Sequence, residues 1–185
     1  MIRLFVGIAL PPALRQTLAQ LASGLPQARL TPPENLHLTL RFIGEVDEVQ
    51  AEAVDLALAE ITAPSFTLTI AGCGAFDSGS HRAHTLWAGV ERADALLHLH
   101  DKVEWAVVGT GLPHEGRKYT PHITLARLRA TPLAKVQAMI AGNNLLKESV
   151  PVASFTLFSS RLGHGNPVYT AEAEYPLGTI PSPRA

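Results

Sequence analysis

The chain has 185 residues and a formal net charge of −1, which suits one domain or two small lobes and argues against a basic surface that coats nucleic acid. Hydrophobic residues make up 46% and charged residues 17%, so a sizeable core is expected and disorder is not. The single cysteine, Cys73, excludes an internal disulfide. With no membrane-length apolar run and no leader pattern before the first strand, we expect a cytoplasmic protein without membrane association.

Hydrophobic periodicity predicts strands and helices that alternate along the chain. Strands are expected at residues 4–10, 36–43, 66–70, 85–90, 119–128, 153–160 and 167–174, and helices at 12–25, 47–62, 93–108 and 132–142. The Gly- and Ser-containing residues 72–80 are expected to form a turn. Several connections are short enough for antiparallel pairing, and the order of elements divides into two similar halves.

Two of the expected strands contain the same motif, His-aliphatic-Thr-Leu, at residues 37–40 and 122–125. Because side chains in a strand alternate between faces, His37 and Thr39 share one face, and so do His122 and Thr124. A lone His-x-Thr is common by chance, and a single strand histidine is usually a half-buried structural residue. The duplication instead points to a pocket that holds two imidazoles and two hydroxyls.

Such a pocket suits the hydrolysis of a phosphodiester. One imidazole can accept a proton while the other donates one, and in-line displacement requires these groups on opposite sides of phosphorus. The threonine hydroxyls can donate to the non-bridging oxygens. No carboxylate cluster of the kind used by two-metal hydrolases is present, and P-loop, GxGxxG and GxSxG motifs are absent. We therefore expect no metal and no other cofactor.

Three blocks of the sequence resemble the 2H phosphoesterases, in particular the RNA 2′,3′-cyclic phosphodiesterases, also called 2′-5′ RNA ligase-like proteins. The blocks are RLFVGIALP at residues 3–11, PENLHLTLRFIG at 33–44 and RKYTPHITLAR at 117–127. The resemblance implies an α+β fold with two pseudo-symmetric lobes, each an antiparallel sheet backed by helices. It also implies a central cleft that carries both His-x-Thr motifs, within a single bilobal domain over residues 1–185.

The resemblance further implies the reaction and its catalytic residues. By this resemblance the expected reaction is hydrolysis of a 2′,3′-cyclic phosphate to a 2′-phosphomonoester, and the missing carboxylate cluster predicts that its rate is independent of metal. By likeness to its two motifs, His37 is the proton donor and His122 the proton acceptor, with Thr39 and Thr124 beside them.

Three arginines are candidates for binding the substrate. Arg127 matches an arginine that the family uses to hold the phosphate, although strict alternation places it opposite His122, so the strand must bend or end nearby. Arg41, four residues after His37, is expected on the same face as that histidine. Arg117 precedes the second motif, where the RNA backbone is expected. For Arg127 and Arg41, a solvated charge at a strand end is the structural alternative.

Phe42 and Tyr119 are candidates for stacking on an RNA base, with core packing as the alternative. The expected partners are RNA ends or nucleotides with a 2′,3′-cyclic phosphate, and a monomer is expected. Reversal of the reaction would give 2′-5′ RNA ligase activity. Two alternative functions stay open, a phosphodiesterase for a small nucleotide such as ADP-ribose cyclic phosphate, and a non-catalytic protein that binds RNA ends.

Overall fold

The computed structural model describes residues 1–77, 83–162 and 165–178. The strands are β1 (Ile2–Ala9), β2 (Ala28–Leu30), β3 (His37–Val46), β4 (Phe66–Asp77), β5 (Ala83–Val90), β6 (His122–Leu128), β7 (Lys147–Val152), β8 (Ser154–Arg161) and β9 (Val168–Pro176). The helices are α1 (Pro12–Leu21), α2 (Glu48–Ala59), α3 (Asp94–Gly109) and α4 (Leu133–Gly142), and a short 3-10 helix, η1 (Pro33–Asn35), precedes β3.

The strands form two antiparallel sheets, which confirms the predicted α+β class. One sheet has the order β3-β1-β8-β9 and the other β2-β6-β5-β4-β7. Listed from the motif strand outward, β3-β1-β8-β9 corresponds to β6-β5-β4-β7, with β2 added beyond β6. This correspondence is the pseudo-symmetry of the two lobes.

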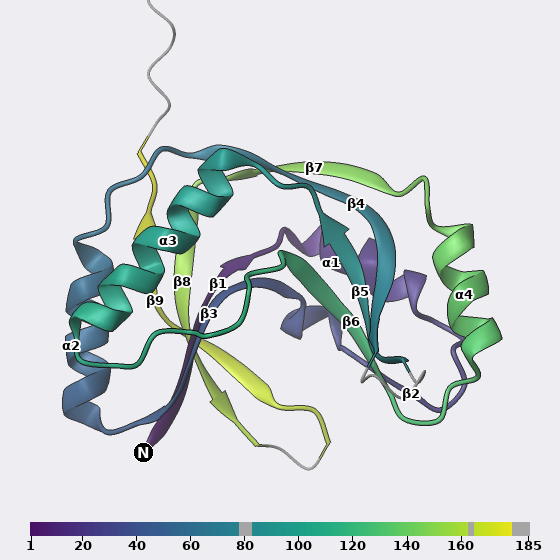
Figure 1. Cartoon of the computed structure of the whole chain (residues 1–185), viewed down its shortest axis with the longest axis horizontal. Coiled ribbons are helices and arrows are strands. Elements are labelled where there is room, and N and C mark those ends of the chain that lie inside the picture. The colour runs from purple at the N-terminus through teal and green to yellow at the C-terminus, as the bar shows by residue number, and fades with distance from the viewer. Residues whose placement is uncertain (78–82, 163–164, 179–185) are drawn as a thin grey trace, which may run out of the picture.

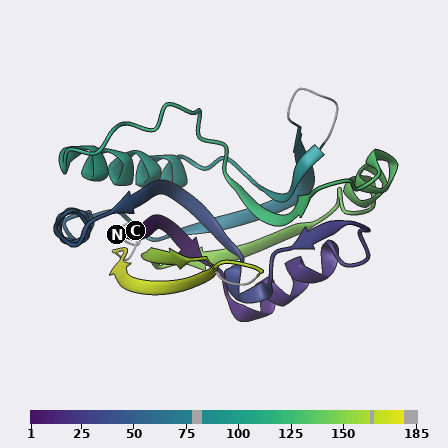
Figure 2. The same ribbon diagram turned by 90° about the horizontal axis from the view of Figure 1, so that it is seen from below.

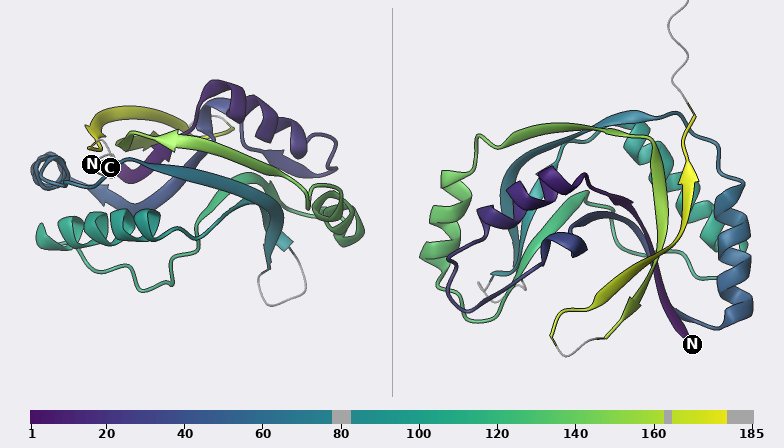
Figure 3. Two further views of the ribbon diagram at one scale, coloured as in Figure 1. Left: turned by 90° about the horizontal axis from the view of Figure 1, so that it is seen from above. Right: turned by 180° about the vertical axis from the view of Figure 1, so that it is seen from behind.

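The lobes are not the two halves of the sequence. The C-terminal strands β8 and β9 complete the sheet begun by β1 and β3, whereas β2 and β4 join the other sheet. The helices follow the same exchange, since α1 contacts β6 and α3 contacts β3. In Figure 1, α2 and α3 lie beside the first sheet and α4 lies at the opposite end of the molecule. Figures 2 and 3 show α1 and α3 on opposite faces of the molecule, with the sheets between them.

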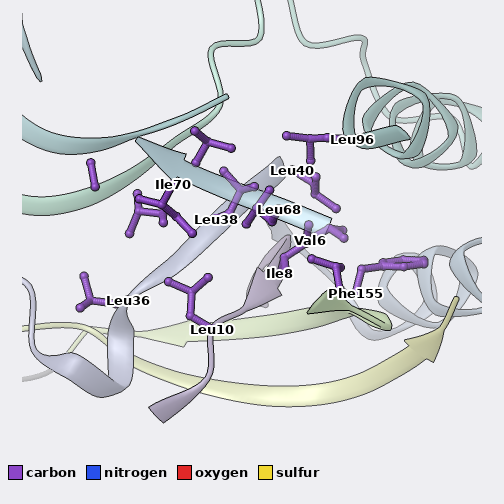
Figure 4. Close-up of a cluster of buried hydrophobic side chains, with 14 of the residues drawn as sticks. Val6, Ile8, Leu10, Leu36, Leu38, Leu40, Leu68, Ile70, Leu96 and Phe155 are labelled. Carbon is purple, nitrogen blue, oxygen red and sulfur yellow. The ribbon is translucent and has the colours of Figure 1, made fainter. Parts of the chain in front are cut away.

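One hydrophobic core joins the two sheets. Figure 4 shows side chains from both sheets, from α3 and from the residue just before β3 gathered there: Val6, Ile8, Leu36, Leu38, Leu40, Leu68, Ile70, Leu96 and Phe155. The motif strand contributes Leu38 and Leu40, which are 0% and 2% exposed, so its apolar face is buried as the alternation predicted. Within the described residues, no helix combines the length and the apolarity needed to cross a membrane.

The turn expected at residues 72–80 is wrong for residues 72–77, which continue β4. Gly74 pairs with Trp87 of β5, and a Cβ on Gly74 would lie 2.2 Å from the indole ring. The glycine therefore makes room for an aromatic ring inside the sheet and does not form a turn. Residues 78–80 lie outside the described residues.

β6 begins at His122, three residues later than predicted. Pro121 has no N–H to donate to a ladder, and Tyr119 turns away from the sheet to donate its hydroxyl to the Thr39 carbonyl, at 3.1 Å. The short strands β2 and β7 were not predicted, because three residues and a polar, Pro-containing run carry little periodic signal.

Candidate active site

The two motif strands, β3 and β6, lie side by side although they belong to different sheets. Their polar faces meet at a cavity of about 240 Å³. His37 and Thr39 line it from the first sheet, and His122 and Thr124 line it from the second. Two imidazoles and two hydroxyls, donated by separate lobes, therefore share one space.

Both imidazoles are held in the same tautomer by the backbone. His37 Nδ1 donates to the Asn35 carbonyl and His122 Nδ1 donates to the Thr120 carbonyl, each at 2.7 Å. In the neutral ring this leaves the lone pair on Nε2. At His37 that nitrogen accepts from the Thr39 hydroxyl, at 3.0 Å. Nε2 is therefore the atom that can exchange a proton with a substrate on each ring.

Burial favours the neutral form of both histidines. Desolvation lowers the pKa of His37 to about 4, opposed by its bond to Asn35 and assisted by the charge of His122. Desolvation also lowers the pKa of His122, opposed by the bond to Thr120 and assisted by Arg127. His122 therefore lies within electrostatic reach of His37 on one side and of Arg127 on the other.

Aromatic rings pack against both imidazoles. Phe5 packs on His37 with 4.7 Å between ring centroids, and Tyr169 meets that imidazole edge-on at 5.3 Å. Phe76 meets His122 edge-on at 4.8 Å. Each imidazole therefore packs against aromatic rings of its own lobe, and these contacts restrict the orientation of the imidazole.

A β-bulge after each motif decides which later side chains reach the cavity. The register of β3 with β1 skips Leu40, and the register of β6 with β5 skips Leu125. The extra residue shifts the alternation by one, so the fifth residue after each motif histidine returns to the face of that histidine. Arg127 and Phe42 occupy these equivalent positions, and both line the cavity.

Arg41 does not share the face of His37, and this expectation is wrong because of the bulge. The side chain is 7% exposed, with Nε 2.5 Å from Glu104 Oε2 of α3 and Nη1 3.6 Å from Glu115 Oε2. Its Nη2 also donates to the Pro113 carbonyl. Arg41 thus ties β3 to α3 and to the loop that leads into β6.

Tyr119 and Arg117 lie at a second cavity of about 290 Å³, which adjoins the first through Thr39, Phe42 and His122. The Tyr119 ring stacks on His100 with 3.9 Å between centroids, so one of its faces is already covered. The Arg117 side chain is 93% exposed. Phe42 is 59% exposed and lines both cavities.

Sequence reasoning missed several polar residues of the first cavity. Arg29, Asn35, Asn166 and Tyr169 line it together with the motif residues, and the described lining contains no Asp or Glu. Arg29, Asn35 and Asn166 lie in a three-residue strand, a 3-10 helix and the β8–β9 connection, where no periodic pattern indicates orientation. Tyr169 lies in β9, within the strand predicted at 167–174, but the sequence did not show that this strand borders the cavity. The sequence signal nearest to them was the block that precedes His37, which contains Asn35.

Metal coordination receives no support from side-chain clustering in the described ranges. No group of three or more His, Cys, Asp or Glu residues within 1–77, 83–162 and 165–178 is arranged to hold an ion. The polar groups that line the cavity are instead imidazoles, hydroxyls, amides and guanidinium groups, which suit an anion.

Comparison with known proteins agrees with this geometry. The model of the LigT-like phosphoesterases matches the chain twice, over residues 8–87 and 89–169, and each match contains one motif. The RNA 2′,3′-cyclic phosphodiesterase of Aeropyrum pernix is 34% identical over 84% of this chain and 88% of its own. That of Escherichia coli is 30% identical over 91% and 92%, respectively.

Among solved structures, E. coli LigT in complex with 3′-AMP superposes with a TM-score of 0.78, at 27% identity and over 95% of this chain and 98% of that one. The fold, the duplicated motif and the sequence likeness therefore agree, and the chain belongs to the LigT-like phosphoesterase family.

Proposed function

We propose that this protein hydrolyses the 2′,3′-cyclic phosphate at an RNA 3′ end to a 2′-phosphomonoester. The observation that carries the proposal is the convergence of two His-Thr pairs, one from each sheet, on a cavity with arginines and without a carboxylate among its described lining. The relatives in A. pernix and E. coli are named for this activity, and the E. coli structure holds a nucleotide, 3′-AMP.

In the proposed reaction the cyclic phosphate lies between the two Nε2 atoms. His122 takes a proton from water as the water oxygen bonds to phosphorus, and the bond from phosphorus to the ribose 3′-oxygen breaks. His37 gives its proton to that oxygen. The products are a 2′-phosphate and a 3′-hydroxyl. His37 has lost a proton to the 3′-oxygen and His122 has gained one from water, and exchange with solvent restores both rings.

The reaction requires a protonated His37, and binding of the phosphate favours that form of the ring. In the free protein burial lowers the pKa of His37 to about 4, so the ring is neutral at pH 7. An anion beside Nε2 stabilises the imidazolium and raises its pKa. The Thr39 hydroxyl, which donates to the neutral ring in the free protein, is then available to donate to a phosphate oxygen.

Thr124 and Arg127 hold the other side of the phosphate. Arg127 Nη1 donates to the Thr85 hydroxyl at 2.8 Å, which orients the guanidinium and leaves other N–H groups for an anion. On the first lobe the equivalent position is the exposed ring of Phe42, which suits stacking on the terminal base. Arg117 at the mouth of the second cavity is available to the RNA backbone.

The test is incubation with a 2′,3′-cyclic mononucleotide in EDTA, followed by chromatographic identification of the product. We expect the 2′-monophosphate, a rate that EDTA does not change, and a 10²- to 10⁴-fold loss in His122→Ala. With a 5′-hydroxyl RNA present, the same site would use that hydroxyl in place of water and form a small amount of 2′-5′-joined product.

Three results would count against parts of the proposal. Full activity of His122→Ala would show that His122 is not the general base. Inhibition by EDTA would show that the reaction needs a metal, and a 3′-monophosphate product would show that the bond to the 2′-oxygen is the one that breaks. A matched control is His98→Ala, since His98 is an exposed histidine of α3 outside both cavities.

A further inference from the structure

Two arginines stand directly opposite each other in the candidate site. In the β2–β6 pair, Arg29 faces Arg127 in register, so their side chains emerge on the same face, and both line the cavity. Like charges in this arrangement repel. In the part of the chain that the structure describes, neither arginine forms an ion pair with a carboxylate. An anionic ligand is the group that would balance this charge.

The two guanidinium groups are oriented in different directions by neutral acceptors. Arg127 donates to Thr85 on β5, at 2.8 Å. Arg29 Nε donates to Asn166 Oδ1, at 2.7 Å, in the connection between β8 and β9 of the other lobe. Neutral partners leave the full positive charge of each arginine, together with its remaining N–H groups, for a ligand. The cavity therefore offers two cationic positions on one face of the β2–β6 pair, one directed toward β5 and the other toward the β8–β9 connection.

Tyr169 lies close to both cations and to the reacting centre. Its ring meets His37 edge-on. Burial raises the pKa of Tyr169, whereas the charges of Arg127 and Arg29 oppose that shift. Arg29 is thus near enough to act on the same substrate as the catalytic pair, while its side chain is held toward Asn166.

We propose that Arg29 and Asn166 form a second phosphate subsite, which binds the internucleotide phosphodiester on the 5′ side of the terminal nucleotide. This inference rests on the proposed function, because Arg127 and the histidines must hold the cyclic phosphate. It makes the substrate an RNA chain end in preference to a cyclic mononucleotide. A mononucleotide without a 5′-phosphate leaves Arg29 without a counter-charge, whereas a chain end supplies one.

Equilibrium binding of product-like ligands tests the subsite without turnover. The ligands are adenosine 2′-phosphate and the dinucleotide ApA with a 2′-phosphate end, and their Kd values are measured by calorimetry. In Arg29→Gln we expect the dinucleotide to bind roughly 10- to 100-fold more weakly, as expected for loss of charge-assisted hydrogen bonds. The monophosphate should bind within about twofold of the wild type, because Arg29 does not hold its phosphate.

Further variants and salt separate the subsite from a general loss of charge. Arg129→Gln removes an exposed arginine just beyond β6 that does not line the cavity, and should change neither affinity. Asn166→Ala should weaken the dinucleotide less than Arg29→Gln does. The slope of log Kd against log salt for the dinucleotide should become shallower by about 0.7 in Arg29→Gln.

Three outcomes would overturn the assignment. Equal weakening of both ligands in Arg29→Gln would place Arg29 on the catalytic phosphate, and no weakening of either would exclude it from binding. Arg29-dependent affinity for adenosine 2′,5′-bisphosphate, but not for the dinucleotide, would make the subsite one for small nucleotides. If the wild type hydrolyses no cyclic phosphate but binds the dinucleotide selectively through Arg29, the proposed function fails and the subsite stands.

Discussion

At the scale of single residues, the proposed chemistry depends on which of the two histidines is the proton donor. Burial lowers the pKa of His37 to about 4, and this depression in the free protein would by itself favour a base at that position. The proposed function has His37 as the acid, which requires that the bound phosphate raise the pKa of His37 until the ring is protonated. The two assignments differ in which histidine protonates the leaving oxygen.

A substrate with a good leaving group separates these roles. A nucleoside p-nitrophenyl phosphodiester releases nitrophenolate without protonation, so an acid contributes little to its cleavage. We expect His37→Ala to lose about 10²- to 10⁴-fold in kcat/KM on the cyclic nucleotide and much less on the aryl ester. His122→Ala should be impaired on both, because water needs a base in both. Release of nitrophenolate and chromatography of the cyclic substrate give the two values.

The opposite pattern would exchange the roles. If His122→Ala is spared on the aryl ester and His37→Ala is not, His122 is the acid. His98→Ala is again a suitable control, because His98 is exposed and lines neither cavity.

The sequence was sufficient for side chains whose orientation depends on local alternation and insufficient where a partner strand intervenes. Period-2 alternation predicted which motif residues share a face. It misplaced Arg41, because the bulge at Leu40 arises from the register with β1. Arg29 escaped detection because only its pairing in β2 shows that it faces the cavity.

At the scale of the elements, Arg41 holds three segments together. Its guanidinium joins β3 to α3 through Glu104 and to the following loop through Glu115 and the Pro113 carbonyl. Glu104 in turn accepts from the backbone N–H of Glu115, at 2.8 Å. The loop that delivers Tyr119 and His122 to the site therefore depends on this buried pair.

Removal of one partner should destabilise the fold strongly. Arg41→Met removes the guanidinium from the buried Glu104 carboxylate and leaves only the exposed His114 imidazole, 3.4 Å from Oε1, beside it. We expect the free energy of unfolding to fall by about 3–5 kcal/mol. In Arg41→Met/Glu104→Gln no buried charge is left unpaired, because the remaining carboxylate, Glu115, is 34% exposed and lies 3.9 Å from Arg117. The amide oxygen at position 104 can still accept from the Glu115 N–H, so much of the loss should be recovered. Urea denaturation measures both variants.

An exposed ion pair of the same sheet provides the comparison. The side chains of Arg3 and Glu45 are 46% and 56% exposed, so Arg3→Met should cost no more than about 1 kcal/mol. A single Arg41 variant as stable as the Arg3 variant would show that the buried pair does not hold the loop.

At the scale of the whole molecule, the exchange of strands between lobes makes the cavity a property of the complete fold. β8 and β9, from the second half of the sequence, complete the sheet begun by β1 and β3, whereas β4 and β5, from the first half, lie in the sheet of the second motif. Periodicity predicts that such segments are strands but not which partners they choose, since β8 pairs with β1 from the opposite end of the chain. Because the chain passes repeatedly between the sheets, the two lobes cannot separate without unfolding, which suits a site with one histidine on each.

The burial of His37 and His122 makes the free energy of unfolding depend on pH. The folded protein holds His37 at a pKa of about 4, below the value of 6.5 expected in the unfolded chain, and it also lowers the pKa of His122. Between these pH values the unfolded state binds more protons, so the free energy of unfolding falls as the pH is lowered from 6.5 to 4. The loss that His37 contributes is about 3 kcal/mol.

Urea denaturation of the wild type and of His37→Gln at pH 7.5, 6, 5 and about 4 tests this linkage. The neutral amide binds no proton, so the variant should lose less stability across this range, and the difference between the two slopes isolates His37 from the carboxylates. Inorganic phosphate, which favours the imidazolium, should stabilise the wild type more at pH 5 than at pH 7.5. Parallel slopes for the two proteins would show that the ring between Phe5 and Tyr169 titrates as it does in water.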